Sequence, residues 1–550
     1  MTRGPRFLQS LLQSLVLFGI LVSPGAFLRA QSSSASQGDQ RQSGPSTLAE
    51  RIRAVTSRPE FKHSHFGIEF ISLDDGSVVY AQNSDKFFVP ASTTKLLTEG
   101  TALELLGPDY RFHTRVYRTG PIAADGTVTG DLILVASGDP NLSNRIQPDG
   151  TLAFENHDHA YGGSPDTRAV PGDPLAVIRA LAAQIAGKGI KRIRGNVRVD
   201  ISLYPEGARE GGTAVVISPI IVNDNVIDLT VGPGTIPGAP AVLRTSPQTS
   251  YATFVNKVTT GSSDSKPDFD VAGDVANPDG TRVVTLTGNV PWGSLSIVHN
   301  YAVAQPSRFA EVVLREALAA AGVTVESSTA PAAPQPPGSK ALAASYSDAN
   351  MVAEHISPPF SEEVKVTLKV SQNLHASSMP FLLAAVLAHK PDVQAGFDLE
   401  HDFLAKAGLD LSGAAQSDGA GADAFFTPDF MVHYLAFMSR QKDFPLFLNA
   451  LPVLGRDGTL WNIQPDSPAA GHVRAKTGTL SRYNALNKNV MVTGKGLAGY
   501  LTTTDGRRLA FALYVNLIPV SFEDPDAVTK VAGQALGEIA AAAYDSPAKP

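Results

Sequence analysis

The stretch VPASTTKLLTEG, residues 89–100, places a serine at the start of a helical pattern and a lysine three positions after it. Leucines recur at helical spacing from position 96 to 106, and Gly107-Pro108 ends the pattern because proline cannot continue the hydrogen-bond ladder. Residues three apart share a helix face, so the Ser92 hydroxyl and the Lys95 amine can meet. Ser92 would also lie at the N–H-rich end of the helix, where negative charge is stabilised.

This spacing alone does not identify a nucleophile. The same Ser-x-x-Lys pattern occurs at three other places, which are Ser263/Lys266, Ser439/Lys442 and Ser546/Lys549. At any single one of these places, a helix-capping serine beside a solvated lysine is the ordinary interpretation.

Two further motifs distinguish Ser92 from the other serines. Ser371-Gln372-Asn373 is the only Ser-x-Asn of the chain, and residues 476–478 form its only Lys-Thr-Gly. Only Ser92 lies upstream of both, follows a predicted hairpin and opens a predicted helix. The order Ser-x-x-Lys, Ser-x-Asn, Lys-Thr-Gly is typical of penicillin-binding proteins and class A β-lactamases, in which the second motif is Ser-Asp-Asn.

Each part of this set has a chemical use. A serine hydroxyl is a weak nucleophile until a base removes its proton, and Lys95 can do so if burial and a nearby Lys476 lower its pKa. Ser371 can relay the proton toward a leaving amine.

The third motif is suited to binding the C-terminal end of a peptide substrate. Lys476 and Thr477 offer a charge and a hydroxyl to a terminal carboxylate, while Gly478 lets a substrate backbone lie close to the strand edge. The alternative is that these residues have no catalytic role. Ser371 and Asn373 would then simply start a helix, and residues 476–478 would form an ordinary edge strand.

The composition excludes several classes of function. With 550 residues, of which 43% are hydrophobic and 18% charged, the chain can form a large core and more than one domain. A net charge of −7 and a pI near 6.0 argue against nucleic acid as a partner. The absence of cysteine excludes disulfides, thiol nucleophiles and cysteine-ligated metals.

Two histidine pairs raise the alternative of a metal hydrolase. They are His63-Ser-His65 and His157-Asp-His159, and both lie in predicted loops without a spaced third ligand. We therefore expect exposed loop histidines at both places, no metal and no cofactor.

The N-terminus predicts export. Arg3 and Arg6 precede an apolar stretch at 8–21 and small residues at 23–26, so residues 1–30 are interpreted as a signal peptide. A transmembrane anchor is the alternative, but glutamines and serines interrupt the stretch, and no later segment could cross a bilayer. The Ser/Gln/Gly-rich residues 31–46 predict a flexible tether. We expect an exported protein of the periplasm or cell envelope.

The two ends of the chain are predicted to build one antiparallel sheet. A hairpin is expected over 66–80, with a turn at 74–76, and a second one over 499–515, with a turn at 505–506. Helices are expected at 47–56, 361–387, 430–438 and 526–543, and a strand at 473–480.

The middle of the chain has a different pattern, typical of inserted domains with β character. Strands are expected at 132–135, 197–199, 220–231 and 283–287, and helices at 174–187 and 308–322. A Pro/Ala-rich linker is expected at 327–338.

The chain resembles the D-Ala-D-Ala carboxypeptidase/endopeptidases among the low-molecular-mass, class C penicillin-binding proteins. The resemblance covers nearly the whole mature chain and rests on these stretches: PASTTKLLT at 90–98, SGDPNLS at 137–143, VRVDISLYP at 197–205, VNDNVIDLTVGPG at 222–234, GRDGTL at 455–460 and VRAKTGTLS at 473–481. This family carries a large insertion between its first two motifs, and here about half of the chain separates Ser92 from Ser371.

The resemblance implies an α+β fold, in which a β-lactamase/transpeptidase-like domain of antiparallel sheet and helices is interrupted by a large β-rich insertion. The expected boundaries are 47–133 and 357–550 for the catalytic domain, 134–225 and 296–356 for the inserted domain, and 226–295 for a second, nested one.

The resemblance also implies roles for individual residues. Ser92 is the acylated nucleophile, Lys95 its base, and the backbone N–H groups of Ser92 and Thr479 form the oxyanion hole. Asn373 holds the substrate amide. Asp200 matches an aspartate that binds the free amino end of the stem peptide; the alternative is a solvent-exposed aspartate at a strand end.

Three departures from the family pattern are visible. Gln372 stands where the family usually has aspartate, the family has a glutamate near Ser377, and the stretch 418–428 contains no arginine, unlike the corresponding family stretch.

The sequence therefore predicts a serine D-Ala-D-Ala carboxypeptidase, with possible endopeptidase action, whose partners are peptidoglycan peptides and β-lactam inhibitors. A β-lactamase or esterase that uses the same serine is the nearest alternative. A non-catalytic peptidoglycan-binding module is a further alternative, against which the intact set of three motifs argues. The oligomeric state is left open.

Overall fold

The computed structural model describes residues 47–326, 346–524 and 526–546. The predicted signal peptide (1–30), tether (31–46) and linker (327–338) lie outside the described residues. None of the helices in the described part of the chain combines the length and the apolar character that crossing a bilayer requires.

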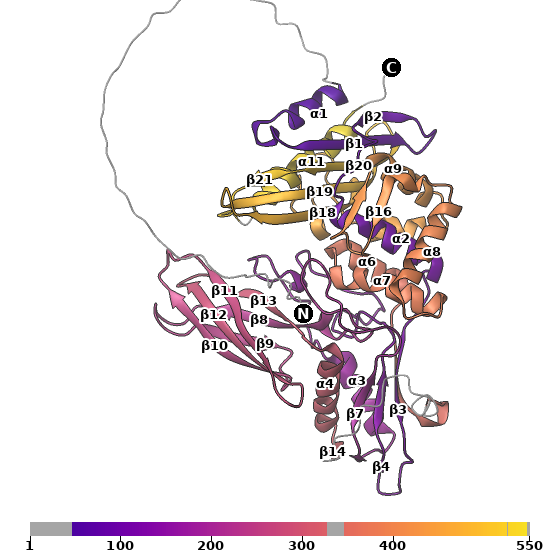
Figure 1. Ribbon diagram of the computed structural model, residues 1–550, viewed down its shortest axis with the longest axis vertical. Coiled ribbons are helices and arrows are strands. Elements are labelled where there is room, and N and C mark those ends of the chain that lie inside the picture. The colour runs from indigo at the N-terminus through magenta and orange to yellow at the C-terminus, as the bar shows by residue number, and fades with distance from the viewer. Residues whose placement is uncertain (1–46, 327–345, 525, 547–550) are drawn as a thin grey trace, which may run out of the picture. The chain divides into compact units, whose positions relative to one another are not determined.

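One antiparallel sheet contains strands from both ends of the chain. Its order is β18-β19-β20-β1-β2, and β21 pairs with β19. The strands are β1 (His65–Ser72), β2 (Val78–Gln82), β18 (Val473–Asn484), β19 (Asn489–Thr502), β20 (Arg508–Asn516) and β21 (Ile518–Val520). β1 pairs with β20 along its whole length, and Figure 1 shows the N-terminal strands in indigo beside the C-terminal strands in yellow. The predicted joining of the two ends in one sheet is confirmed.

Helices cover both faces of this sheet because its central strands are apolar on both sides. Alternate residues of β20 belong to different cores: Ala510, Ala512 and Tyr514 face one, and Phe511, Leu513 and Val515 face the other. The first core is closed by α2 (Lys95–Leu106), α6 (Phe360–Val370), α7 (Asn373–Leu387), α8 (Val393–Lys406), α9 (Pro428–Met438) and α10 (Phe444–Ala450). The second is closed by α1 (Leu48–Thr56) and α11 (Gln534–Tyr544).

The predicted helix at 361–387 is two helices. α6 ends before Ser371, whose φ of 64° is left-handed and cannot continue a helix. α7 then starts at Asn373, where the Gln372 side chain accepts a hydrogen bond from the Leu374 N–H. The second motif therefore lies at a corner between two helices.

The middle of the chain forms separate sheets. The first is β15 (Met351–Ile356), β3 (His113–Arg118), β5 (Leu132–Val135) and β7 (Val197–Asp200); the second is β14 (Thr324–Glu326), β6 (Arg192–Arg194) and β4 (Thr127–Thr129). The third is β13 (Ile297–Ala302), β8 (Val226–Gly232) and β9 (Val242–Ser246); the fourth is β10 (Ala252–Gly261), β12 (Arg282–Pro291) and β11 (Asp268–Ala276). They share a core of their own with α3 (Ala176–Gly187) and α4 (Pro306–Ala320). A short pair, β16 (Ala414–Gln416) and β17 (Ala424–Phe426), stands apart from these sheets.

The predicted strand at 220–231 begins late. Asn223, Asp224 and Asn225 have φ values of 50°, 53° and 53°, so the chain turns there and β8 starts only at Val226. Three consecutive left-handed residues without glycine are strained, and the structure around them must hold them in place.

The close packing of α2 gives a first prediction. A Cβ added at Gly100 would lie 2.1 Å from Oη of Tyr434, whose hydroxyl donates to the Leu96 carbonyl. We expect Gly100→Ala to lower the free energy of unfolding by about 1–3 kcal/mol, because the overpacked helix must shift. Urea denaturation measures this change.

The control is Gly187→Ala in α3, where an added Cβ has no neighbour within 4 Å. This change should be neutral or stabilising by up to about 1 kcal/mol, as alanine is the better helix former. Equal effects of the two substitutions would contradict the packing of α2 against Tyr434.

Candidate active site

Ser92 lies where α2 meets the edge of the large sheet. It belongs to a short 3₁₀ turn, Ala91–Thr94, that leads into α2, and the residue before it, Ala91, has a left-handed φ of 47°. β18 approaches this turn so closely that a Cβ at Gly478 would lie 2.2 Å from the Pro90 carbonyl oxygen and 3.1 Å from the Ser92 nitrogen. Glycine is therefore required at the third motif for steric reasons.

Lys95 brings the first two motifs together. Its side chain is fully buried, with an exposed fraction of 0%. Nζ lies 2.7 Å from Ser92 Oγ, 2.7 Å from Asn373 Oδ1 and 3.4 Å from Ser371 Oγ. A neutral amine in this place can accept the proton of the Ser92 hydroxyl.

Burial makes that neutral form accessible. It lowers the pKa of Lys95 to about 7, although the negative charges of Glu210, Asp418 and Glu99 act in the opposite direction. The sequence suggested Lys476 as a cause of this shift; in the structure, loss of solvent is the main one.

Lys476 is the second buried amine. Its Nζ donates to Ser371 Oγ at 2.7 Å and to the Thr477 carbonyl at 2.8 Å. Burial, followed by the charges of Lys95 and Lys495, lowers the pKa of Lys476 well below its usual value. The Ser371 hydroxyl thus lies between two amines, an arrangement through which a proton can move.

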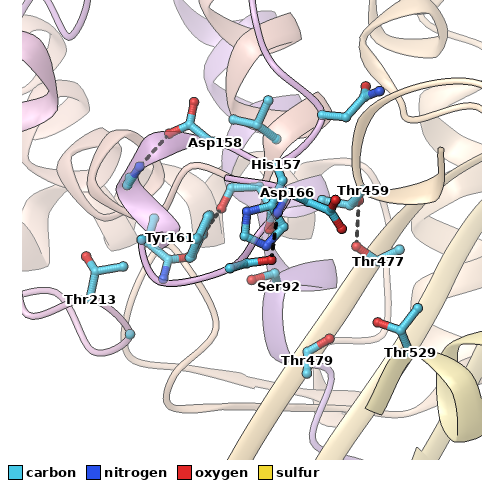
Figure 2. Close-up of a pocket in the computed structure, with 18 of the residues that line it drawn as sticks. Ser92, His157, Asp158, Tyr161, Asp166, Thr213, Thr459, Thr477, Thr479 and Thr529 are labelled. Atoms are coloured by element: carbon cyan, nitrogen blue, oxygen red, sulfur yellow. Dashed lines mark hydrogen bonds between the residues drawn. The ribbon is translucent and has the colours of Figure 1, made fainter. Parts of the chain in front are cut away.

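An open cavity of about 840 Å³ leads to Ser92. Five of the predicted site residues line it, namely Ser92, Ser371, Asn373, Thr477 and Thr479. Figure 2 shows Ser92 between the strand that carries Thr477 and Thr479 and the segments that carry Tyr161 and Thr213. The structure therefore brings all three motifs to one cavity, which the middle of the chain helps to enclose.

Asp200 is not among the residues that line this cavity. It is buried at the end of β7, where its carboxylate accepts hydrogen bonds from the Ser202 N–H and the Tyr346 hydroxyl. It is therefore not a solvent-exposed aspartate either. Its role in binding a substrate amine stays a prediction, which this position does not favour.

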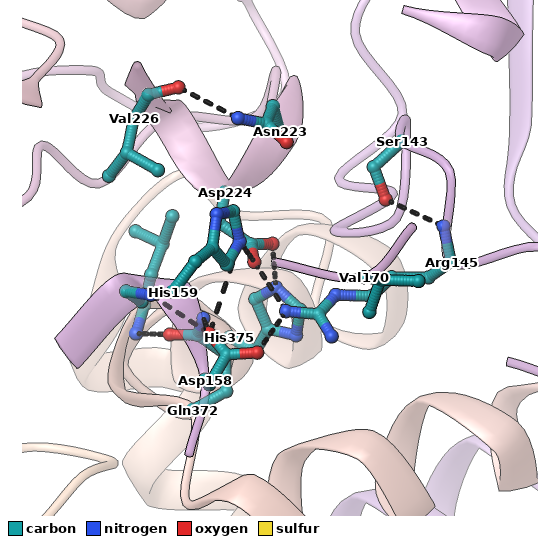
Figure 3. Close-up of polar contacts among 12 residues, drawn as sticks. Ser143, Arg145, Asp158, His159, Val170, Asn223, Asp224, Val226, Gln372 and His375 are labelled. Atoms are coloured by element: carbon teal, nitrogen blue, oxygen red, sulfur yellow. Dashed lines mark hydrogen bonds and ion pairs between the residues drawn. The ribbon is translucent and has the colours of Figure 1, made fainter. Parts of the chain in front are cut away.

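A buried cluster of charges lies next to the second motif. Figure 3 shows Asp224 at its centre, where it accepts hydrogen bonds from Arg145 at 2.7 Å, His159 at 2.8 Å and His375 at 2.9 Å. The expectation of an exposed loop was thus wrong for His159, which is buried with Asp224 and Asp228 as partners. His63 and His65 are exposed, as predicted, although His65 begins β1 and is not in a loop. His157 is half-buried in the lining of the cavity, so the prediction was wrong for it as well.

The cluster compensates its own charges. Although burial disfavours the charged form, Glu363 and Asp224 raise the pKa of His375 to about 10, so this imidazole is a cation at neutral pH. Asp158, His159 and Asp224 lie close enough to share a metal ion, but the Arg145 guanidinium already pairs with both aspartates. The positive charge that these carboxylates need is therefore supplied by side chains.

This cluster ties the middle of the chain to the second motif. The Tyr161 hydroxyl donates to the Ser371 carbonyl, and the Gln372 amide donates to Asp158 at 3.4 Å. His375, in the first turn of α7, reaches Asp224. The sequence analysis missed these contacts, since their partners lie far apart in the chain.

Comparisons with known proteins identify the family of the chain. Residues 48–536 match the D-Ala-D-Ala carboxypeptidase 3 (S13) family. A D-alanyl-D-alanine carboxypeptidase from an Actinomadura species is 26% identical over 491 residues, which cover 85% of this chain and 81% of the relative. D-alanyl-D-alanine carboxypeptidase DacB from Haemophilus influenzae is 23% identical over 470 residues, which cover 82% of this chain and 85% of the relative.

A solved structure has the same fold. The crystal structure of penicillin binding protein 4 (dacB) from Haemophilus influenzae matches with a TM-score of 0.68 at 20% identity, over 90% of this chain and 99% of that one. The predicted fold class, a transpeptidase-like α+β domain with a large insertion, is confirmed. With a family match that spans nearly all of the described residues, the chain belongs to the D-Ala-D-Ala carboxypeptidase 3 (S13) family.

Proposed function

We propose that this protein is a serine-type D-Ala-D-Ala carboxypeptidase that acts on peptidoglycan stem peptides through an acyl-enzyme on Ser92. The observation that carries the proposal is the contact of Lys95 Nζ with Ser92, Ser371 and Asn373 at the base of one open cavity. Family membership supports the reaction class.

Acylation begins when neutral Lys95 takes the proton of Ser92 as Oγ attacks the carbonyl carbon of the penultimate D-alanine. The carbonyl oxygen becomes an oxyanion, which the backbone N–H groups of Ser92 and Thr479 stabilise. The C–N bond then breaks, and the leaving amine receives a proton from Lys95 through the Ser371 hydroxyl. The products of this half-reaction are free D-alanine and a Ser92 ester.

Deacylation reverses these roles. A water molecule gives a proton to Lys95 and attacks the ester carbonyl, and Ser92 leaves with a proton, which restores the enzyme. A β-lactam is attacked in the same way, but the ring opening leaves the amine attached to the acyl group. Penicillin is therefore expected to remain bound as a covalent adduct.

Several finer properties belong to the same proposal. The chain is exported by residues 1–30 to the periplasm or cell envelope, and cleavage of peptide cross-links accompanies removal of terminal D-alanine. Residues 47–133 and 357–550 form the catalytic domain, and the inserted residues 134–356, with 226–295 nested in them, help to shape the cavity. The contacts of Tyr161 and Asp224 with the second motif support a role for the insertion in positioning it.

The assignment of the nucleophile predicts a covalent penicillin adduct on Ser92. Intact-mass measurement should show one adduct on the wild-type protein and none on Ser92→Ala, because Ser92 Oγ lies 2.7 Å from Lys95 Nζ, whereas the Ser371 hydroxyl lies at 3.4 Å and is assigned to the proton relay. The matched control is Ser439→Ala, which removes a serine of the same Ser-x-x-Lys spacing and should leave the adduct intact. An adduct that survives in Ser92→Ala would overturn the assignment.

The lifetime of this adduct separates the alternatives. Rapid return to the unmodified mass would favour a β-lactamase, whereas an adduct that persists for many minutes is expected for the peptidase. Incubation with purified muropeptides then identifies the products: loss of D-alanine from monomers indicates carboxypeptidase action, and conversion of cross-linked dimers to monomers indicates endopeptidase action.

The pKa of Lys95 predicts a pH dependence for acylation. Since burial sets this pKa at about 7, the base is protonated and inactive below that pH. The acylation rate should fall about tenfold per pH unit below 7 and level off above it. Lys95→Arg should abolish acylation, because guanidinium stays protonated. The control is Lys442→Arg, because Lys442 belongs to another Ser-x-x-Lys pattern and its side chain is 82% exposed. A flat profile between pH 5 and 8 would contradict Lys95 as the base.

Asp224 is predicted to be a positioning residue for the second motif. Asp224→Asn removes one of the two carboxylates that pair with each of Arg145 and His375 and leaves them Asp158 and Glu363 respectively, so α7 should shift and penicillin acylation should slow about 10- to 100-fold. The loss is expected in the rate constant of acylation, with little change in the affinity for penicillin.

The control for this variant is Asp131→Asn, which removes an aspartate that pairs with Arg198 of the insertion. Thermal unfolding of both variants identifies any general loss of stability. Normal acylation by folded Asp224→Asn protein would show that Asp224 serves stability alone.

A further inference from the structure

Lys495 is a third buried lysine of the active-site region, and the acylation mechanism does not use it. It lies on β19, paired in register with Thr479 of β18. Its Nζ donates to Thr479 Oγ1 at 2.7 Å, and both residues line the cavity that contains Ser92. The amine is therefore next to the strand edge along which a peptide would bind.

The charge of Lys495 has no counter-ion in the described part of the chain. The side chain is only 8% exposed, and no carboxylate among the described residues lies within ion-pair distance of it. Its one hydrogen-bond partner, the Thr479 hydroxyl, is neutral. Burial accordingly lowers the pKa of Lys495 to about 8. An unpaired buried cation is costly, and its presence in a cavity points to an anionic ligand.

The surroundings of Lys495 suit a carboxylate. Thr459, Thr477 and Thr529 line a small neighbouring pocket of about 40 Å³ together with Lys495 and several apolar residues. Within it the Thr477 hydroxyl donates to the Thr459 hydroxyl at 2.7 Å. Figure 2 shows these three threonines on the same side of Ser92 as Thr479. Hydroxyls and an ammonium all donate hydrogen bonds to a carboxylate.

The acidic residues of the cavity have other neighbours. Asp158, Asp166 and Asp526 all act on the pKa of His157, which places their charges around that imidazole. Asp526 also lies 3.7 Å from the amine of Lys530. Lys476 cannot take the place of Lys495 as a free cation, because its amine is already directed to Ser371 and the Thr477 carbonyl.

We propose that Lys495, with the hydroxyls of Thr477 and Thr479, forms the subsite that binds the terminal carboxylate of the peptide substrate. The inference rests on the proposed carboxypeptidase function, whose substrate ends in a free carboxylate next to the bond that is cut. Lys495 then sets the requirement for a free C-terminus, while Lys476 remains a member of the proton relay.

The test compares two peptides that differ only in charge at this end, an N-acylated Lys-D-Ala-D-Ala and the same peptide with a C-terminal amide. For Lys495→Met, kcat/KM for the free acid should fall about 10- to 100-fold, as expected for loss of a hydrogen bond to a charged group. The value for the amide should stay within about twofold of wild type. Lys495→Arg should keep part of the preference for the acid because it keeps the charge.

The control is Lys488→Met, which removes the same charge from an exposed position of the β18–β19 hairpin and should change neither value. Equal losses for both peptides in Lys495→Met would overturn the proposal, and would show that Lys495 acts on Lys476 or on folding. An unchanged preference for the acid would overturn it as well. Failure of the proposed function would look different, since the wild-type protein would then cleave neither peptide.

Discussion

The burial of one amino group organises the active site of this protein. Lys95 has no access to solvent, so its amine must find hydrogen-bond partners within the protein. It finds them on three segments that are far apart in the chain: Ser92 in its own helical turn, Ser371 and Asn373 at the corner between α6 and α7, and the Ala420 carbonyl before β17. The same burial moves the pKa of Lys95 close to neutrality. A single constraint therefore both assembles the three segments and gives the amine the proton affinity of a base.

Two of the segments around this amine contain strained backbone. Ala91 precedes Ser92, and Ser371 carries the second hydroxyl near Lys95; both Ala91 and Ser371 have left-handed φ values without being glycine. The strained run at Asn223–Asn225 contacts the helix that carries Asn373, because Asp224 binds His375 in the first turn of α7. Such conformations persist only where surrounding contacts hold them. At Ser371 these contacts include the Tyr161 hydroxyl from the insertion. The insertion thus contributes to the geometry of residues that belong to the catalytic motifs.

The sequence was informative wherever the relevant geometry is local. Ser92 and Lys95 are three residues apart on a helix, and the hairpins are marked by Asp-Gly turns, so both could be predicted. The joining of the chain ends in one sheet followed from two hairpins that each needed partners. The contacts of Asp224 could not be predicted, since left-handed asparagine and aspartate have no distinct pattern and Arg145, His159 and His375 are distant in sequence. Lys495 could have been noticed in the sequence, because it is the one charged residue of segment 489–502. The rest of that segment has the neutral composition of a buried strand, and it forms β19.

The three buried lysines also explain how one cavity can handle both a proton and an anion. Lys95 and Lys495 each depress the pKa of Lys476, so the positive charge of Lys476 is limited by repulsion as well as by burial. The charge that remains favours every anion of the reaction: the developing serine alkoxide, the oxyanion and the substrate carboxylate. A carboxylate that binds beside Lys495 would reduce the repulsion on Lys476 and favour its protonated form. In the proposed mechanism, substrate binding would therefore be coupled to the protonation of the relay around Ser371, while Lys95, whose pKa is set mainly by burial, would stay available as the base.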